Sequence, residues 1–268
     1  MKVKDIINHF VSRADERVNK ETTVDRVIVG DPDLDVDRCL VSWMPNYHAL
    51  EQVVERGMRL LICHEPTFWN HGNDKATEDP ESQRKLAFIE KHGLVIVRNH
   101  DCWDAWPKVG VPWAWAKFLE LDSQPVDMAE DRYHHRYDID PMPLEAFAKR
   151  VAKQCATIGE PMVQVIGDGS QMVSRIGVGT GCACDIYAYQ LIGCDCSIVC
   201  DDGSIYWGNI QKAKDSLHPV IRVNHGTAEE PGMVTMTQYI NDHIDGVTAE
   251  HLLHGSTFRL MGAEGSAN

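Results

Sequence analysis

Apolar positions recur along several segments of the chain with the spacing of amphipathic helices. The first apolar stripe consists of Val3, Ile6, Ile7, Phe10 and Val11. Further helical patterns end at Gly57, at Gly93 and near Leu217, and another covers residues 143–155 with a proline in its opening turn. These segments predict helices that each cover an apolar surface with one face.

Compact apolar runs lie between the helical patterns and predict strands. The predicted strands are 26–29, 39–44, 60–63, 94–97, 162–166, 173–178, 196–199 and 220–223. Strands that alternate with helices predict an α/β fold, with parallel or mixed sheets flanked by helices. We expect two strand-helix-strand lobes, the first formed by residues 1–125 together with 230–268 and the second by residues 126–229.

Polar side chains follow three of the predicted strands. The three motifs are His-Glu-Pro at 64–66, His-Asp-Cys-Trp-Asp at 100–104 and His-Gly-Thr-Ala-Glu at 225–229. A His beside an acid is weak evidence alone, because the chain has 13 His and 40 Asp and Glu. All three motifs nevertheless follow a strand, where ligand sites of α/β folds collect. Buried acids and imidazoles at such a position are costly unless a cation neutralises them.

The residue types in these motifs suit divalent metal ions. Imidazole nitrogen together with carboxylate oxygen binds first-row metals such as Mn, Fe, Co and Zn, whereas Mg and Ca prefer oxygen alone. Two ions need several ligands, and one carboxylate can bridge them. The sequence therefore predicts two divalent ions per chain, with Fe, Mn or Zn expected. The predicted ligands are His64, Glu65, Asp104, His225 and Glu229.

A pair of divalent ions predicts hydrolysis, because the ions lower the pKa of a water molecule toward neutrality. His100 is the predicted proton donor and His71 a second candidate, since both lie near ligands in the sequence. The expected substrate is a small cyclic amide, heterocycle or nucleotide-like molecule. The alternative is a non-catalytic metal-binding oligomer that stores or delivers ions, or that scaffolds a partner.

Composition narrows the choice of partners and compartment. A formal net charge of −14 argues against nucleic acid and anionic membranes as partners, since both attract basic surfaces. No segment approaches the roughly 20 apolar residues of a membrane span, and the first residues do not resemble a secretory signal. Nine scattered cysteines indicate free thiols in a reducing compartment. We expect a cytoplasmic protein that acts on small molecules.

The order of these motifs resembles the Nif-three-like family of proteins with dinuclear metal centres, often labelled homologues of a type 2 GTP cyclohydrolase. The opening helix and the Val-Gly-Asp-Pro at 29–32 are similar to the start of that family. Residues 61–66 resemble its strand ending in His-His-Pro, and residues 100–104 resemble its His-Thr-Asn-Leu-Asp segment. Segments 165–168, 175–178, 193–195 and 225–229 follow in the family's order and approximate spacing.

The resemblance implies properties that periodicity does not reveal. It implies metal ligation by His64, Asp104, His225 and Glu229, with Glu229 as the bridge between the two ions. It also implies a toroidal homohexamer whose metal sites face an internal cavity.

Two departures from the family pattern bear on the chemistry. Glu65 stands where the family has the second His of His-His-Pro, which makes the site harder and more anionic. We expect this change to favour Fe or Mn over Cu. The family also places a His four residues after an Asp in a Thr-Gly-Asp segment. Here Asp201 is present, but Ile205 stands in place of that His.

The cysteines permit a third hypothesis, a thiol-based redox protein or a thiolate metal cluster. Cys182 and Cys184 form one C-x-C pair, Cys194 and Cys196 another, and Cys200 lies nearby. Zinc and iron-sulfur sites usually use C-x2-C spacing, and free Cys commonly packs as a small apolar side chain. Buried packing is therefore the favoured interpretation.

Glycines and tryptophans near the motifs also have two interpretations each. The glycines at 177, 179 and 181 could cradle a phosphate, but close packing of a helix on the sheet is favoured. Tryptophans after Asp104 could stack on a heterocyclic base. Trp113 and Trp115 are two positions apart and cannot share a helix face, so at least one is expected to cover a neighbouring subunit or loop.

Overall fold

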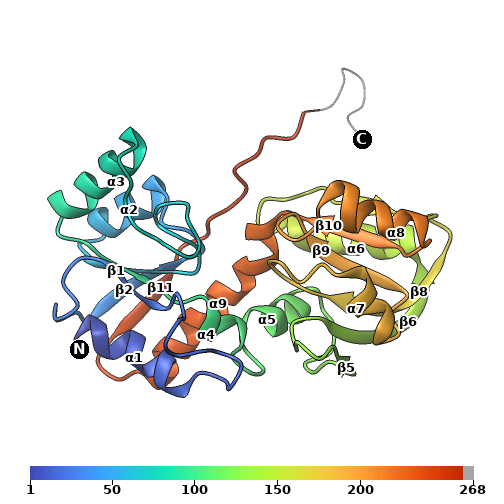
Figure 1. Cartoon of the computed structure of the whole chain (residues 1–268), viewed down its shortest axis with the longest axis horizontal. Coiled ribbons are helices and arrows are strands. Elements are labelled where there is room, and N and C mark those ends of the chain that lie inside the picture. Colours follow the sequence, from blue (N-terminus) through green and yellow to red (C-terminus); the bar gives the residue numbers. More distant parts are fainter. Residues whose placement is uncertain (262–268) are drawn as a thin grey trace.

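The computed structural model describes residues 1–261 and contains two mixed sheets flanked by helices, as predicted (Figure 1). The first sheet has the order β1-β4-β3-β2-β11, and only β1 runs antiparallel to its neighbour. Parallel strands β2, β3 and β4 therefore end at the same edge. The strands are β1 (Arg26–Val29), β2 (Arg38–Ser42), β3 (Leu60–Cys63), β4 (Val95–Arg98) and β11 (Thr248–His251).

The second sheet has the order β5-β6-β8-β9-β10-β7. Its three central strands β8, β9 and β10 are parallel, and β5, β6 and β7 pair antiparallel at the two sides. The strands are β5 (Asp127–Met128), β6 (His135–Pro143), β7 (Gln164–Ile166), β8 (Met172–Val178), β9 (Cys196–Cys200) and β10 (Val220–Val223). The sequence did not predict β6, because its charged residues and prolines interrupt any apolar run.

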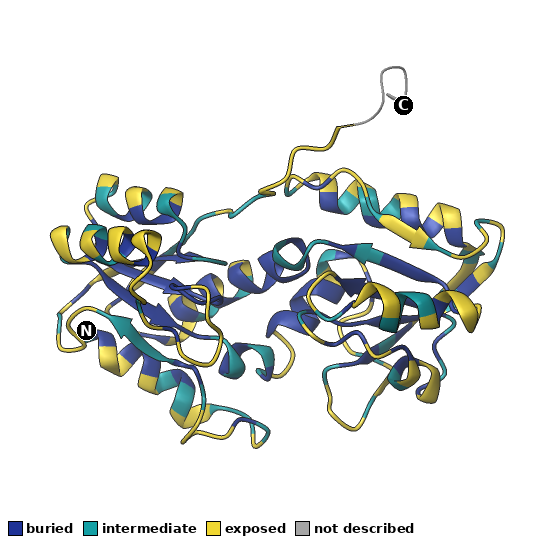
Figure 2. Cartoon of the chain, turned by 45° about the horizontal axis from the view of Figure 1, so that its top comes forward, coloured by how far each residue is buried: buried dark blue, intermediate teal, exposed yellow. Residues whose placement is uncertain are grey.

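Helices cover both faces of each sheet, with exposed residues on their outer sides (Figure 2). In the first lobe α2 and α3 pack on one face and α1 and α9 on the other. In the second lobe α6 covers one face, and α7 and α8 cover the other. The helices are α1 (Val3–Arg13), α2 (Tyr47–Glu55), α3 (Pro80–Lys91), α4 (Asp101–Asp104), α5 (Val111–Phe118), α6 (Leu144–Ala156), α7 (Ile186–Leu191), η1 (Tyr206–Ile210, a π-helical turn), α8 (Gln211–Asp215) and α9 (His225–His243).

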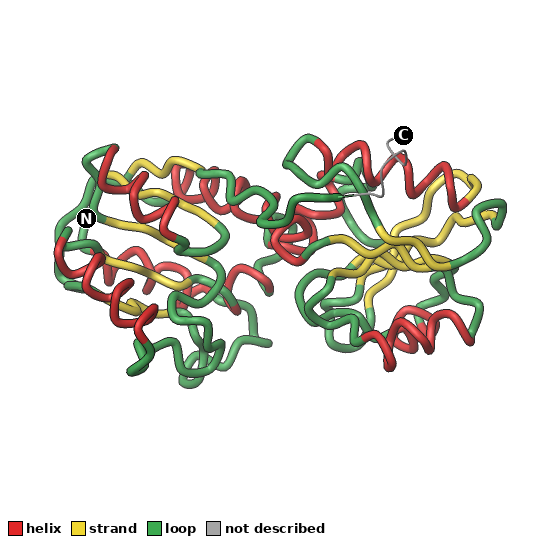
Figure 3. The backbone as a smooth tube through the Cα atoms, turned by 90° about the horizontal axis from the view of Figure 1, so that it is seen from above, coloured by secondary structure: helices red, strands yellow, loops and turns green. Residues whose placement is uncertain are grey.

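Two helices, α5 and α9, join the lobes that lie side by side in Figure 3. Helix α9 contributes Ala228 to the core of the second lobe and Met233 to that of the first, so the boundary predicted between residues 229 and 230 falls inside this helix. The two helices approach closely at Gly232, where a Cβ atom would lie 2.8 Å from Cγ2 of Val111. A glycine is required there because nothing larger fits between the helices.

The tryptophans of α5 lie inside the chain. Trp115 belongs to the core of the second lobe and stacks on Phe118, while Trp113 meets His135 edge to face at 4.6 Å. Both side chains are buried, so neither needs a second subunit to cover it. None of the helices in the described part of the chain has the length and apolar character needed to span a bilayer.

Trp103 packs in the core of the first lobe, and its replacement is therefore expected to lower stability. Its ring is fully buried and Nε1 donates a hydrogen bond to the carbonyl of Gly232 (2.7 Å). Trp103→Ala is expected to lower the free energy of unfolding by about 3–5 kcal/mol. The matched control is Trp207→Ala, because 81% of the Trp207 side chain is exposed and its truncation should change stability by less than about 0.5 kcal/mol. Urea unfolding followed by circular dichroism compares the two, and equal midpoints would contradict the assignment.

Candidate metal centre

The structure brings the three predicted motifs together between the lobes. His64 and Glu65 follow β3, and Asp104 lies at the end of α4, which follows β4. His225 and Glu229 lie one turn apart at the beginning of α9, directly after β10 of the second sheet. The centre therefore forms where the carboxyl edge of one sheet meets the helix that leaves the other.

The five predicted ligands form two overlapping groups. In one, Nε2 of His64 lies 3.4 Å from Oδ1 of Asp104 and 3.4 Å from Oε2 of Glu229. In the other, Nε2 of His225 lies 2.9 Å from Oε1 of Glu229 and 3.4 Å from Oε1 of Glu65. The two oxygens of Glu229 thus face different groups, which is the arrangement a bridging carboxylate needs.

Three buried atoms of these groups have no hydrogen-bond partner among the described residues. They are Nε2 of His64, Oδ1 of Asp104 and Nε2 of His225. Such unpaired polar atoms are costly in a protein interior unless a ligand satisfies them. Nδ1 of His64 donates to the carbonyl of Asn99 (3.2 Å), which leaves a lone pair on Nε2 for a cation. Imidazole nitrogens and carboxylate oxygens converge here, and the groups His64–His100–Asp104 and His64–Glu65–Glu229 could each hold a divalent metal ion.

The electrostatics of the groups favour bound positive charge. Burial alone would lower the pKa of His64, but the carboxylates of Asp104 and Glu229 raise it to about 9. Burial alone would also lower the pKa of His225, but the carboxylates of Glu229 and Glu65 raise it to about 10. Burial would raise the pKa of Glu229, yet His225 and His64 lower it to about 2. In the metal-free chain, His64 and His225 are therefore imidazolium ions. Their positive charge lies beside the carboxylates that would attract metal cations.

The two predicted proton-transfer residues lie beside the ligand groups. The ring of His100 stacks on that of His64 with centroids 4.3 Å apart, and its Nδ1 lies 2.9 Å from Oδ1 of Asp101. His71 meets His100 edge to face at 4.7 Å. Donor atoms of Glu65, His71 and His100 lie within 4.8 Å of one another. Their roles in proton transfer stay predictions.

Three neighbours of the centre, Trp43, Arg98 and Asn99, were not found by sequence reasoning, and a fourth, Asp201, was noted there only as part of a family segment. Nε1 of Trp43 donates to Oε2 of Glu229 (2.9 Å), and the carbonyl of Asn99 accepts from His64. Arg98 lies buried against Glu65, and the backbone N–H of His225 donates to Asp201. Trp43, Asn99 and Asp201 follow strands β2, β4 and β9, and Arg98 is the last residue of β4. Their position at or after the end of a strand was the available signal for Trp43, Arg98 and Asn99, but only His and acidic residues were weighed as ligands from the sequence.

The glycine run resolves into two structural roles. A Cβ atom at Gly177 would clash with the ring of Tyr189 on α7, and one at Gly179 with its hydroxyl, so these glycines permit helix-on-sheet packing, as favoured. Gly181 has φ +52°, and a Cβ atom there would lie 3.1 Å from Oε1 of Glu229. The loop that contains Gly181 therefore covers the metal centre from the second lobe.

The cysteines form no metal-ligating group within residues 1–261. All nine are free, and Cys182 alone is exposed. Burial raises the pKa of Cys194 to about 12 and holds that of Cys196 higher still. Thiols with such pKa values are neutral and inert at physiological pH, which agrees with the packing interpretation for this C-x-C pair.

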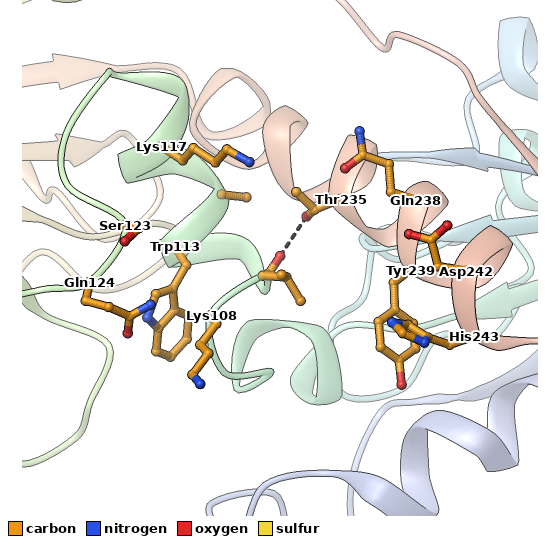
Figure 4. A pocket seen from close by; sticks show the side chains of 12 residues that line it. Lys108, Trp113, Lys117, Ser123, Gln124, Thr235, Gln238, Tyr239, Asp242 and His243 are labelled. Carbon is orange, nitrogen blue, oxygen red and sulfur yellow. Dashed lines mark hydrogen bonds between the residues drawn. The ribbon is translucent and has the colours of Figure 1, made fainter.

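Two cavities lie near the junction of the lobes. The cavity in Figure 4 measures about 250 Å³, lies between α5 and α9 and contains none of the predicted site residues. There, the hydroxyl of Thr235 donates to the carbonyl of Val109 (2.7 Å). A second cavity of about 110 Å³ adjoins the metal centre and is lined by Trp43, His225 and the segment 254–258. Only the smaller cavity touches a predicted ligand.

Solved structures share this two-lobed fold. The chain is similar to Staphylococcus aureus protein SA1388, with a TM-score of 0.78 and 17% identity over 97% of this chain and 99% of that one. A Bacillus cereus protein related to NIF3 gives a TM-score of 0.79 at 13% identity, covering 97% and 99% of the two chains. Reduced HcgD from Methanocaldococcus jannaschii gives 0.70 at 16% identity, covering 94% and 98%. A search of curated proteins gave no match.

The fold and the acid-imidazole cluster define a two-lobed α/β protein with residue clusters suited to metal ions. The model of the Duf34/NIF3 (NGG1p interacting factor 3) family matches residues 1–255, and the chain belongs to this family.

The raised pKa values of His64 and His225 predict how the stability of the metal-free protein depends on pH. A folded-state pKa above the ordinary 6.5 contributes stability that is fully present below pH 6.5 and is lost as pH rises through 9 to 10. Between about pH 7 and pH 10, chelator-treated protein should lose about 1–3 kcal/mol more than a His64→Gln/His225→Gln double variant. Thermal melts across this range measure the difference, and parallel curves would show that the shifts are absent.

Proposed function

We propose that the chain is a metal-dependent hydrolase with two divalent ions, acting on a small cyclic amide, heterocycle or nucleotide-like substrate. The observation that carries this proposal is the position of Glu229, whose two oxygens face two ligand groups with unpaired buried atoms. One ion would be held by His64, Asp104 and Glu229, and the other by Glu65, His225 and Glu229.

Two divalent ions in these positions would lower the pKa of a water molecule and polarise a substrate oxygen. The chain's own residues supply orientation and exclusion of solvent. Trp43 holds Glu229 in place, and the Gly181 loop closes over it from the second lobe. His100 stacks on the ligand His64 and His71 meets His100, so either could donate a hydrogen bond to substrate or transfer a proton.

The accessibility of the ligands supports turnover over closed storage. His64 and Glu229 are buried, but the side chains of Asp104 and His225 keep 20% and 17% of their surface exposed. Each ligand group therefore contains one side chain that reaches solvent, although the ligand atoms Oδ1 of Asp104 and Nε2 of His225 are themselves buried. The cavity of about 110 Å³ beside His225 suits a small substrate. A homohexamer in the cytoplasm is proposed from the family resemblance alone.

Metal content tests the ligand assignment. Native protein purified without chelator is expected to hold about two equivalents of Fe, Mn or Zn, and His64→Ala and Glu229→Gln are each expected to lose at least one. The controls His48→Ala and Glu51→Gln change exposed residues of the same types on α2 and should retain both. Elemental analysis gives the counts. Full metal content in either ligand variant would remove that residue from the centre, and a metal-free native protein that takes up no Mn, Fe or Zn would end the proposal.

Glu65 allows a sharper test of metal preference. Replacing this oxygen donor by the family's imidazole makes the site softer, so Glu65→His is expected to bind Zn more tightly relative to Mn, by about tenfold. Competition between Zn and Mn, measured on Glu65→His and in parallel on native protein, gives the ratio of the two affinities. Glu51→His introduces the same side chain at an exposed position and should leave the ratio unchanged. An unchanged ratio in Glu65→His would show that Glu65 is not a ligand.

A further inference from the structure

A buried arginine lies behind the metal centre. Only 1% of the Arg98 side chain is exposed, and its guanidinium makes three hydrogen bonds and one ion pair with described residues. Nε donates to the carbonyl of His64 (3.0 Å), and Nη1 donates to the carbonyl of His71 (2.7 Å). Nη2 lies 3.0 Å from Nδ1 of His71 and 3.5 Å from Oε2 of Glu65. Arg98 thus contacts two members, Glu65 and His71, of a third cluster of candidate ligands, which is formed by Glu65, His71 and His100.

The contact between Arg98 and His71 fixes the tautomer of the histidine. A guanidinium has five N–H donors and no acceptor, and it stays charged in proteins. Nδ1 of His71 must therefore accept the hydrogen bond, so the single proton of the neutral ring lies on Nε2. Burial lowers the pKa of His71, and the nearby His100 and Arg98 lower it further, which keeps the ring neutral at physiological pH.

In this tautomer, His71 has no free lone pair with which to bind a metal ion. A ligating imidazole offers a lone pair, but here Nδ1 already accepts from Arg98 and Nε2 carries the proton. Oε2 of Glu65 is also turned toward Arg98, while its Oε1 lies 3.4 Å from His225. Glu65 consequently presents one oxygen to the centre, and the third cluster loses two of its possible ligand atoms.

We propose that Arg98 is a positioning residue that makes His71 an Nε2–H donor, so that the third cluster binds an anionic oxygen of the substrate instead of a third metal ion. This inference rests on the proposed hydrolase function, in which negative charge develops on a substrate oxygen beside the metals. A fixed N–H donor stabilises such charge because it needs no reorientation when the charge develops. Arg98 and Glu65 form one unit, since the guanidinium offsets the carboxylate that stands where the family has a neutral His.

The tautomer is measured directly on the native chain loaded with Zn. In protein labelled with 15N-histidine, two-bond 1H–15N spectra distinguish a proton on Nε2 from one on Nδ1, and His71→Gln identifies the signals of residue 71. The expected pattern is neutral His71 with the proton on Nε2. A proton on Nδ1, or an imidazolium at neutral pH, would overturn the proposal without the need for any arginine variant.

Anion binding tests the role of the donor, with inorganic phosphate as the probe and calorimetry as the readout. The amide nitrogen of Gln replaces Nε2, so His71→Gln should keep phosphate affinity within about threefold of the native value, whereas His71→Asn and His71→Ala should lose about tenfold. All three variants should retain the native metal content. Equal affinities in all forms would overturn the donor role, and loss of one metal equivalent in His71→Ala would show that His71 is a ligand.

Arg98→Met and Arg98→Lys complete the test. Met removes every donor, so Arg98→Met is expected to show mixed tautomers of His71 and weaker phosphate binding. Lys keeps a charged donor, so Arg98→Lys should preserve part of the Nε2–H tautomer and part of the phosphate affinity. A single Nε2–H tautomer in Arg98→Met would remove Arg98 from this role. Native protein that holds no metal yet shows the expected tautomer would refute the proposed function and leave the Arg98 contact standing, which separates the two failures.

Discussion

The concentration of carboxylates and imidazoles between two apolar cores is the constraint on which the rest of the structure depends. Glu65 and Glu229 are buried, and the pKa values of His64 and His225 are raised by the carboxylates around them. Such a cluster is unfavourable in an apolar interior unless positive charge accompanies it. Protons supply that charge in the metal-free chain, and divalent ions would supply it in the functional protein.

The two lobes depend on each other because the centre uses both. The first sheet delivers its ligands at the ends of β3 and β4, while α9 brings His225 and Glu229 from the second sheet. Helices α5 and α9 fix the distance between the sheets, and the small size of Gly232 lets them pack closely. The loop at Gly181 then covers Glu229. Any change in the angle between the lobes would therefore move His225 and Glu229 away from His64, Glu65 and Asp104.

Glu65 departs from the His-His-Pro pattern of the family, and Arg98 lies against this residue. A carboxylate in place of an imidazole adds negative charge to an already anionic centre. The buried guanidinium of Arg98 compensates that charge from behind, and it also orders His71. The carboxylate of Glu65 in the ligand set is thus accommodated by Arg98, at the end of the neighbouring parallel strand β4.

The sequence by itself determined eight of the 11 described strands, helices α1, α2, α3, α6 and α8, and the three motifs, because apolar periodicity and strand-end position are local properties. It did not predict α9, since Gly226, Pro231 and Gly232 disfavour a helix in isolation. Tertiary packing stabilises this helix, because Trp103 donates a hydrogen bond to Gly232 and α5 packs against it. Packing also decided which residues surround the ligands, since Trp43 and Glu229 are 186 positions apart. Such contacts depend on the docking of two lobes, and no local pattern encodes them.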